Sequence, residues 1–255
     1  MVAAEPRRGR PPSPDDGGDV RRGKCGIGRR RAGETPTSRE DSIERHSPDA
    51  IEAEYDRLAA DYERRWRRYL DASIAATLSR LRLGEPERVL PERVLDVGCG
   101  TGLLIARLAE PLPDARLFGV EPSAGMLRMA RAKRLPRAAL VRAVAEQLPL
   151  RALSFDLVLT LSALHYWHEP AAGMREIYRV LRPGGRVVVT DWCLDYLTTR
   201  AIVGQLRLTR RPLGRVFGAA ALRQLLEGAG FADVVVERYR IGLVWGMMTA
   251  VARKL

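Results

Sequence analysis

The chain has 255 residues, enough for one large domain or a domain with an appendage, but too few for two full domains. Its formal net charge of +12 is carried almost wholly by arginine, because lysine occurs only at positions 24, 133 and 254. A GC-rich genome produces such a bias through codon usage, so the charge by itself does not indicate a nucleic-acid partner.

Two further features concern the compartment of the protein. The sequence contains no run of about eighteen uncharged apolar residues, and its start lacks an apolar stretch followed by small residues, so we expect neither a membrane span nor a secretory signal. Cys25, Cys99 and Cys193 are odd in number and widely separated, which favours reduced thiols over a disulfide framework or a zinc site. These features predict a cytoplasmic protein that holds no metal.

The start of the chain differs in composition from the rest. Residues 1–46 are rich in glycine, proline and arginine and contain few aliphatic side chains to bury. Apolar burial is what offsets the entropy lost on folding, so we predict a disordered tail here. Residues 47–255 are predicted to form one domain, in which helices over 47–84 precede a core over 85–255.

A first helix is predicted from Asp49 to Leu83, because the preceding Ser47-Pro48 suits the N-cap and first position of a helix. Side chains at spacings of three and four share one face of this helix, namely Tyr55, Leu58, Ala59 and Tyr62. The stripe has two interpretations, which are packing against the core and an aromatic cover over a ligand cleft.

From residue 93 onward, short β-branched runs alternate with longer helical patterns. The predicted strands are 93–97, 116–120, 139–144, 155–160, 186–191, 232–240 and 243–253. The predicted helices are 102–110, 123–134, 169–181 and 219–229. This alternation predicts an α/β fold with a doubly wound seven-stranded, mostly parallel sheet and helices on both faces. We expect the last two strands to form an antiparallel hairpin at one edge, and a ligand to bind outside the carboxyl ends of the parallel strands.

The segment from Val94 to Gly102 ends a strand in alternating glycines and then begins a helix. Glycine lacks a Cβ atom, so Gly98, Gly100 and Gly102 let the backbone turn tightly and approach a ligand. A dinucleotide fingerprint would place its third glycine where this chain has Leu103, and the Gly-Lys-Ser/Thr of a nucleoside-triphosphate loop is missing. The pattern therefore argues against a nicotinamide, flavin or nucleoside-triphosphate site.

Glu121 follows the second predicted strand, about twenty residues after the glycines. A carboxylate at this place accepts hydrogen bonds from both hydroxyls of a ribose in dinucleotide sites. An acid here is equally compatible with a surface position near the start of a helix. Both interpretations stay open from the residue alone.

Four motifs in order carry a resemblance to a known family. They are the glycine segment 94–102, Val-Glu-Pro-Ser at 120–123, Ala-Glu-Gln-Leu-Pro at 145–149 and Glu-Ile-Tyr-Arg-Val-Leu-Arg-Pro-Gly-Gly-Arg at 176–186. Together they resemble class I S-adenosylmethionine-dependent methyltransferases, most of all the subgroup that includes the ubiquinone and menaquinone biosynthesis methyltransferases. The resemblance covers roughly residues 50 to 255 and implies a Rossmann-like fold that binds S-adenosylmethionine as cosubstrate.

The resemblance also implies which residues contact this cosubstrate. They are Tyr55, Tyr62, Asp96, Gly98, Cys99, Gly100, Gly102, Glu121, Pro122, Met126, Ala145, Glu146 and Leu161. Asp96 and the glycines would line the methionine and ribose part, Glu121 would hold the ribose hydroxyls, and Leu161 would face the methionine end. The helix that carries Tyr55 and Tyr62 resembles the family's cofactor-covering amino-terminal helix.

The adenine end departs from the family pattern at one position. Met126 would flank the adenine, with the backbone of Ala145 and Glu146 near its edge. Val144 stands where the family often has an aspartate that accepts a hydrogen bond from the adenine amino group. Glu146 or water would then take that role.

A sulfonium methyl group is already electrophilic, so its in-line displacement needs mainly a well-placed acceptor, which we expect to be a small molecule. His165, after the fourth strand, is the candidate general base, and its alternative role is to fix that loop by hydrogen bonding. Asp191, Trp192 and Tyr196, after the fifth strand, are candidate substrate contacts. The alternative functions are an RNA or protein methyltransferase, in line with the arginine content, and a non-catalytic subunit that binds S-adenosylmethionine.

Overall fold

The computed structural model describes residues 48–81, 90–135 and 137–255. The predicted tail, 1–46, lies outside these described residues. The helices of the described part are α1 (Pro48–Leu58), α2 (Tyr62–Leu81), α3 (Leu103–Leu108), α4 (Ala124–Ala132), α5 (Pro170–Val180), α6 (Leu197–Leu208) and α7 (Ala219–Gly228). The strands are β1 (Arg93–Val97), β2 (Arg116–Val120), β3 (Ala138–Val141), β4 (Phe155–Leu161), β5 (Leu181–Trp192), β6 (Ala232–Ile241) and β7 (Trp245–Arg253).

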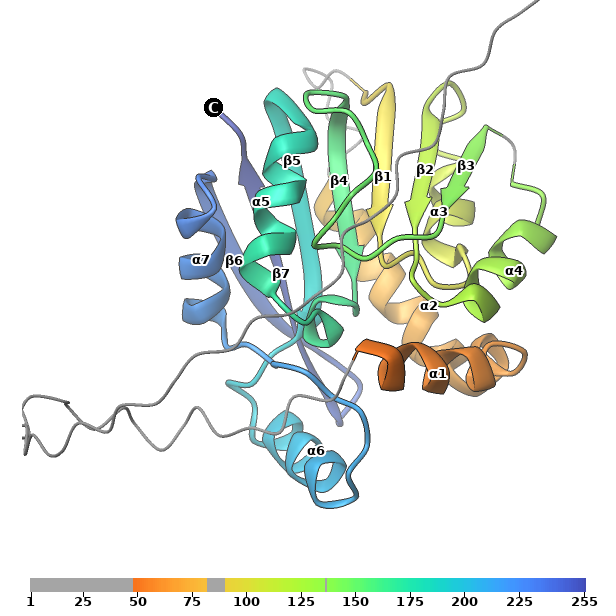
Figure 1. Cartoon of the computed structure of the whole chain (residues 1–255). Coiled ribbons are helices and arrows are strands. Elements are labelled where there is room, and N and C mark those ends of the chain that lie inside the picture. The colour runs from red at the N-terminus through yellow and green to blue at the C-terminus, as the bar shows by residue number, and fades with distance from the viewer. Residues whose placement is uncertain (1–47, 82–89, 136) are drawn as a thin grey trace, which may run out of the picture. The chain divides into compact units, whose positions relative to one another are not determined.

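The strands form one seven-stranded sheet in the order β3-β2-β1-β4-β5-β7-β6 (Figure 1). β1 to β5 pair in parallel, whereas β7 pairs antiparallel with both β5 and β6. This arrangement confirms the predicted doubly wound fold and its edge hairpin. The strand order reverses between β1 and β4, so a ligand is expected at the carboxyl ends of these strands and of β2.

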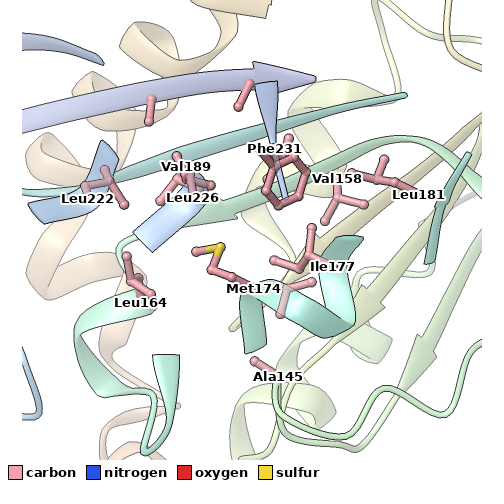
Figure 2. Packing of buried hydrophobic residues seen from close by; sticks show 14 of the residues in the cluster. Ala145, Val158, Leu164, Met174, Ile177, Leu181, Val189, Leu222, Leu226 and Phe231 are labelled. Atoms are coloured by element: carbon pink, nitrogen blue, oxygen red, sulfur yellow. The ribbon is translucent and has the colours of Figure 1, made fainter. Parts of the chain in front are cut away.

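Helices cover both faces of the sheet, because its central strands are apolar on both sides. On one face α5 and α7 contribute Met174, Ile177, Leu222 and Leu226 to the core; Figure 2 shows these side chains packed with Val158 and Val189 of the sheet and with Phe231. On the other face α2 and α3 bury a second cluster, made by Ile74, Leu81, Leu104, Ile105 and Leu108 over strands β1, β2 and β4.

The single helix predicted from Asp49 to Leu83 is wrong in one respect, because the described part of it is broken into α1 and α2. Residues 59–61 form a turn in which the Asp61 N–H donates to the Leu58 carbonyl at 3.1 Å. Asp61 directly precedes α2 at the N-cap position, where its carbonyl accepts a hydrogen bond from the Arg65 N–H at 2.9 Å. Aspartate is a favoured N-cap, so the break has a cause in the sequence that apolar periodicity overlooks. The break separates α1 from α2, and α1 lies across the lower end of the sheet (Figure 1).

Two other expectations differ from the structure. The helix α6, absent from the prediction, occupies Leu197–Leu208 between β5 and α7. The third strand ends at Val141 instead of residue 144, because Ala143 and Val144 leave the sheet and line a cavity. Within the described ranges, none of the helices combines the length and apolar character that crossing a bilayer requires.

Candidate functional site

A cavity of about 470 Å³, here called the first cavity, opens where β1, β2 and β4 end. Most residues that the resemblance implied to bind a cofactor line it. They are Tyr55, Tyr62, Gly98, Gly100, Glu121, Pro122, Met126, Ala145, Glu146 and Leu161. These residues come from six separate segments of the chain, so the fold brings together what the sequence motifs indicated one by one.

The glycine loop after β1 has a backbone that only glycine adopts without strain. Gly98, Gly100 and Gly102 have φ angles of 78°, 52° and 75°. A Cβ atom on residue 98 would lie 2.4 Å from the Cβ of Ala163, whereas a Cβ on residue 100 would meet nothing within 4 Å. Gly98 therefore permits close packing of the loop, and Gly100 leaves open space on a wall of the first cavity.

Glu121 follows β2 and is only 7% exposed. Its Oε2 accepts a hydrogen bond from the Gly100 N–H at 3.0 Å, and its Oε1 accepts one from the Ser123 N–H at 2.9 Å. Burial raises the pKa of Glu121 to about 7, although these two amide hydrogen bonds act in the opposite direction. A carboxylate oxygen accepts more than one hydrogen bond, so both oxygens remain able to bind hydroxyl groups of a ligand.

Asp96 lies in β1 beneath the glycine loop and does not itself line the first cavity. Burial, together with the nearby charge of Glu121, raises the pKa of Asp96 to about 8. Its Oδ1 has no hydrogen-bond partner within the described part of the chain. A buried polar atom without a partner costs free energy, so a cationic ligand in the adjoining cavity would offset this cost.

Two other predicted residues also lie outside the lining of the first cavity. Cys99 belongs to the core cluster on the face of the sheet that α2 and α3 cover, and burial raises the pKa of its thiol. Gly102 precedes α3, and a Cβ there would lie 3.1 Å from the Cβ of Ala130. Both residues therefore have a packing role in the structure, and direct contact of either with a cofactor stays a prediction.

Aromatic side chains from α1, from α2 and from the turn after β4 line the first cavity. The ring of Tyr55 lies 5.9 Å from that of Tyr62 and 5.1 Å from that of Tyr166, both in edge-to-face geometry. Burial raises the pKa of all three phenols, so they stay protonated at neutral pH. Tyr55 and Tyr62 of the stripe line the first cavity, and their role as an aromatic cover over a ligand stays a prediction.

The loop after β3 and the helix α4 form another part of the wall of the first cavity. Val144 presents an apolar side chain there, and Met126 is 1% exposed. Glu146 also lines the cavity, and its Oε1 accepts a hydrogen bond from the Glu169 N–H at 3.1 Å. Apolar and polar side chains therefore meet here, since Gln147, His168 and Glu169 also line the first cavity.

A second cavity of about 190 Å³ adjoins the first, and Ile51, Tyr55, Tyr62, Ser162 and Tyr166 line both. Its remaining walls are rich in aromatic residues that sequence reasoning did not assign to a site, namely Trp66, Tyr69 and Trp245. Trp66 and Tyr69 continue the helical spacing of Tyr62, which was an available signal. Trp245 has no such signal, because only the pairing of β7 with its neighbours brings it here.

His165 lines the second cavity and not the first. It lies in a short 3₁₀ turn (Leu164–Tyr166) after β4 and is 1% exposed. Its Nδ1 is 2.5 Å from Oδ1 of Asp191, near the end of β5. Trp192 also lines this cavity, so two of the three candidate substrate contacts after β5 lie at or beside it.

Comparisons with known proteins identify the family. A family model described as a methyltransferase domain matches residues 95–189. A malonyl-[acyl-carrier protein] O-methyltransferase from Laribacter hongkongensis is 31% identical over 226 aligned residues, which cover 80% of this chain and 71% of the relative. The chain belongs to the S-adenosylmethionine-dependent methyltransferases.

Two further proteins resemble the methyltransferase over most of their length. A demethylmenaquinone methyltransferase from Renibacterium salmoninarum is 28% identical over 230 aligned residues. The alignment covers 77% of this chain and 90% of the relative. The crystal structure of a methyltransferase from Thermotoga maritima, described as S-adenosylmethionine-dependent and a possible histamine N-methyltransferase, gives a TM-score of 0.64 at 25% identity. That match covers 79% of this chain and 98% of the other. Both comparisons agree with the Rossmann-like fold.

S-adenosylmethionine is the methyl donor of the methyltransferase. The first cavity fits this molecule in three respects. The carboxylate of Glu121 suits ribose hydroxyls, the unpartnered Asp96 carboxyl suits positive charge, and the space above Gly100 admits a ligand against the backbone.

Proposed function

We propose that the methyltransferase binds S-adenosylmethionine in the first cavity and methylates a small molecule in the second. The observation that carries this proposal is the shared wall, in which Ile51, Tyr55, Tyr62, Ser162 and Tyr166 line both cavities. Methyl transfer requires donor and acceptor to meet at short distance and in line. Two adjoining cavities with a common wall supply such a meeting point.

The residues that line or adjoin the first cavity have separate binding roles in this proposal. Glu121 accepts hydrogen bonds from the ribose hydroxyls, and Asp96 offsets the positive charge of the methionine part. Met126 and Val144 provide apolar contacts for the adenine, with Glu146 at its rim. The bound S-adenosylmethionine supplies an activated methyl group, and the protein aligns the acceptor and excludes water.

The size and walls of the second cavity support a small acceptor. Its volume of about 190 Å³ is enclosed by side chains of α1, α2 and α6, among them Leu58, Trp66 and Ile202. One sequence relative is named for a malonyl group carried by acyl-carrier protein, and the other is named for demethylmenaquinone. An aromatic enclosure of this kind favours a small molecule over RNA or a folded protein.

One pair of variants on α6 tests the proposal. Leu206 lines the second cavity but not the first, so Leu206→Trp fills acceptor space without touching the cofactor site. Leu208 on the same helix is 86% exposed, which makes Leu208→Trp the matched control. Wild type and both variants are incubated with metabolite extracts and isotopically labelled S-adenosylmethionine, and S-adenosylhomocysteine binding is measured on the same samples.

Labelled small molecules should accumulate with wild type and Leu208→Trp, and at least about tenfold more slowly with Leu206→Trp, since overpacking blocks the cavity. All three proteins should bind S-adenosylhomocysteine equally. Label that enters RNA or protein of the extract instead, or undiminished transfer by a folded Leu206→Trp variant, would refute the small-molecule site.

A further inference from the structure

Glu54 and Arg211 form an ion pair at the second cavity, which both residues line. Nη1 of Arg211 donates to Oε1 of Glu54 at 2.9 Å, and the side chains of Arg211 and Glu54 are 55% and 22% exposed. Apart from His165, they are the basic and acidic side chains among the described residues that line this cavity. Most of the remaining wall is aromatic or aliphatic, so a charged group on a bound molecule would find its counter-charge here.

The charge at this place is positive on balance. The carboxylate of Glu54 is shared by two arginines, because its Oε2 also accepts from Nη2 of Arg57 at 3.2 Å. The two guanidinium groups outweigh the single carboxylate, which leaves an excess of positive charge. An apolar wall screens charge less than water does, so this excess attracts an anion into the second cavity more strongly than it would on an open surface.

The guanidinium of Arg211 keeps unused hydrogen-bond donors. Its Nη1 is engaged by Glu54, and no other acceptor in the described part of the chain bonds to the guanidinium. The N–H groups of Nε and Nη2 lie parallel along one edge of an arginine, which matches two oxygens of a carboxylate or phosphate. The side chain of Arg211 therefore retains a two-donor edge suited to an oxyanion.

The backbone that carries Arg211 is held in place by its neighbours. The Arg211 N–H donates to the carbonyl of Leu206 in the last turn of α6 at 2.9 Å. Pro212 follows and restricts the backbone of the residue before it. Leu213 is only 3% exposed and belongs to a core cluster with Val203 of α6. Less backbone freedom is then lost when a ligand binds to Arg211.

Arg211 lies away from the place where methyl transfer is proposed. It lines the second cavity but not the first, as does Glu54. The proposed meeting point of donor and acceptor is the wall that both cavities share, to which neither residue belongs. An anionic group bound to Arg211 is therefore an anchor, and a different atom of the same molecule receives the methyl group.

We infer that the acceptor of this methyltransferase carries an oxyanion group, a carboxylate or a phosphate, which binds the free edge of Arg211 and is not itself methylated. The inference rests on the proposed function and makes Arg211 a specificity-determining residue. The acceptor then has an anionic end, an apolar body that fits between the aromatic walls, and a nucleophilic atom at the shared wall.

Binding of simple acids to the methyltransferase loaded with S-adenosylhomocysteine tests the anchor without turnover. The probes are benzoate, phenyl phosphate and neutral benzamide, compared by calorimetry at the same ionic strength. At least one of the two acids should bind about tenfold or more tightly than benzamide, and the tighter acid identifies the anionic group. Leu206→Trp should remove this binding, because it fills the second cavity.

Two arginine variants separate the anchor from general charge. Arg211→Gln should abolish the preference for the acid while leaving the affinity for benzamide unchanged. Arg207→Gln removes the same charge from an exposed position of α6 that lines neither cavity, so it should bind all probes like the parent. Circular dichroism checks that both variants are folded.

The labelled products formed in metabolite extracts give the second readout. Because the anchor is not methylated, these products should remain anionic and be retained by an anion exchanger at about pH 8. Arg211→Gln should raise KM for the labelled acceptor by about tenfold or more, and Arg207→Gln should not.

Three results would each overturn the inference and leave the proposed function intact. They are acids that bind no tighter than benzamide, a preference for the acid that survives in a folded Arg211→Gln variant, and labelled products that pass the anion exchanger. Failure of the wild type to label any small molecule would instead overturn the proposed function.

Discussion

The carboxylate of Asp56 on α1 accepts a hydrogen bond from the hydroxyl of Ser123, 2.6 Å away at the start of α4. The same Oδ1 accepts the Gly125 N–H at 2.7 Å, and these hydrogen bonds lower the pKa of Asp56. The hydroxyl of Ser123 in turn accepts the Met126 N–H at 3.1 Å. Asp56 thus links α1 to Ser123, the N-cap of α4, and α4 carries Met126.

Asp56→Ala should therefore weaken cofactor binding, although Asp56 itself does not line the cavity. Removing the two hydrogen bonds frees α1, and with it the cover made by Tyr55, at a cost of about 1 kcal/mol for a largely exposed carboxylate. The dissociation constant for S-adenosylhomocysteine, measured by calorimetry, should rise about three- to tenfold. Asp49→Ala, an exposed acid in the first turn of the same helix, should leave the constant unchanged. If Asp56→Ala and Asp49→Ala bind S-adenosylhomocysteine with equal affinity, the hydrogen bonds of Asp56 do not hold α1 over the first cavity.

Alanine substitutions at Gly100 and Gly184 distinguish the effect of backbone strain from the effect of blocking the first cavity. Both have positive φ, 52° and 78°, and a Cβ on either meets nothing within 4 Å. Each substitution to alanine should cost about 1–2 kcal/mol of stability through strain alone. Only Gly100→Ala adds a methyl group to the lining of the first cavity, so it alone should weaken S-adenosylhomocysteine binding, by at least about tenfold. A Gly100→Ala variant that binds as well as Gly184→Ala would place the ligand elsewhere.

The raised pKa values of Asp96 and Glu121, about 8 and about 7, make the stability of the ligand-free protein depend on pH. Both pKa values exceed those of the same groups in the unfolded chain. At a pH between the unfolded and the folded pKa, the folded protein therefore binds more protons than the unfolded chain, and stability is lost as the pH rises through this range. Between pH 5.5 and 8.5 the free energy of unfolding should fall by about 2–5 kcal/mol through these groups.

Asp96→Asn should flatten that decline, because an amide does not titrate. Chemical denaturation of wild type and variant across this pH range measures the difference in slope, and Asp114→Asn serves as the exposed control. A slope that is the same in wild type and Asp96→Asn would show that Asp96 is ionised in the folded protein throughout.

The sheet was predictable because buried parallel strands are continuous apolar runs, so β1, β2, β4 and the edge hairpin lie within a few residues of their expected places. The helix α6 was not predicted, since Arg200 and Arg207 interrupt the apolar stripe of Ile202, Val203 and Leu206. Hydrophobic periodicity predicts a helix only where apolar residues recur regularly at spacings of three and four.

The first cavity was predictable for a different reason, because each motif that forms it follows a strand directly. The second cavity was predictable only in part, because His165, Trp192 and Trp245 meet through the pairing of β4 with β5 and of β5 with β7. That pairing places His165 beside Asp191 and brings Trp245 against Trp192, at 5.3 Å between rings. Ser162 has a φ of 53°, a strained value for a residue other than glycine, and no sequence pattern signals it.

The assignment of Glu121 to the ribose is the central claim, and calorimetry of S-adenosylhomocysteine with Glu121→Ala tests it most directly. Charge-assisted hydrogen bonds contribute about 1.5–3 kcal/mol each, and the loss of this acceptor in a buried site should cost about 2–4 kcal/mol net. Affinity should therefore fall by about thirty- to a thousandfold in a variant that circular dichroism shows to be folded, while Glu110→Ala, at an exposed position, binds like the parent. A folded Glu121→Ala protein that binds within about twofold of the parent would contradict the ribose assignment and the placement of the cofactor in the first cavity.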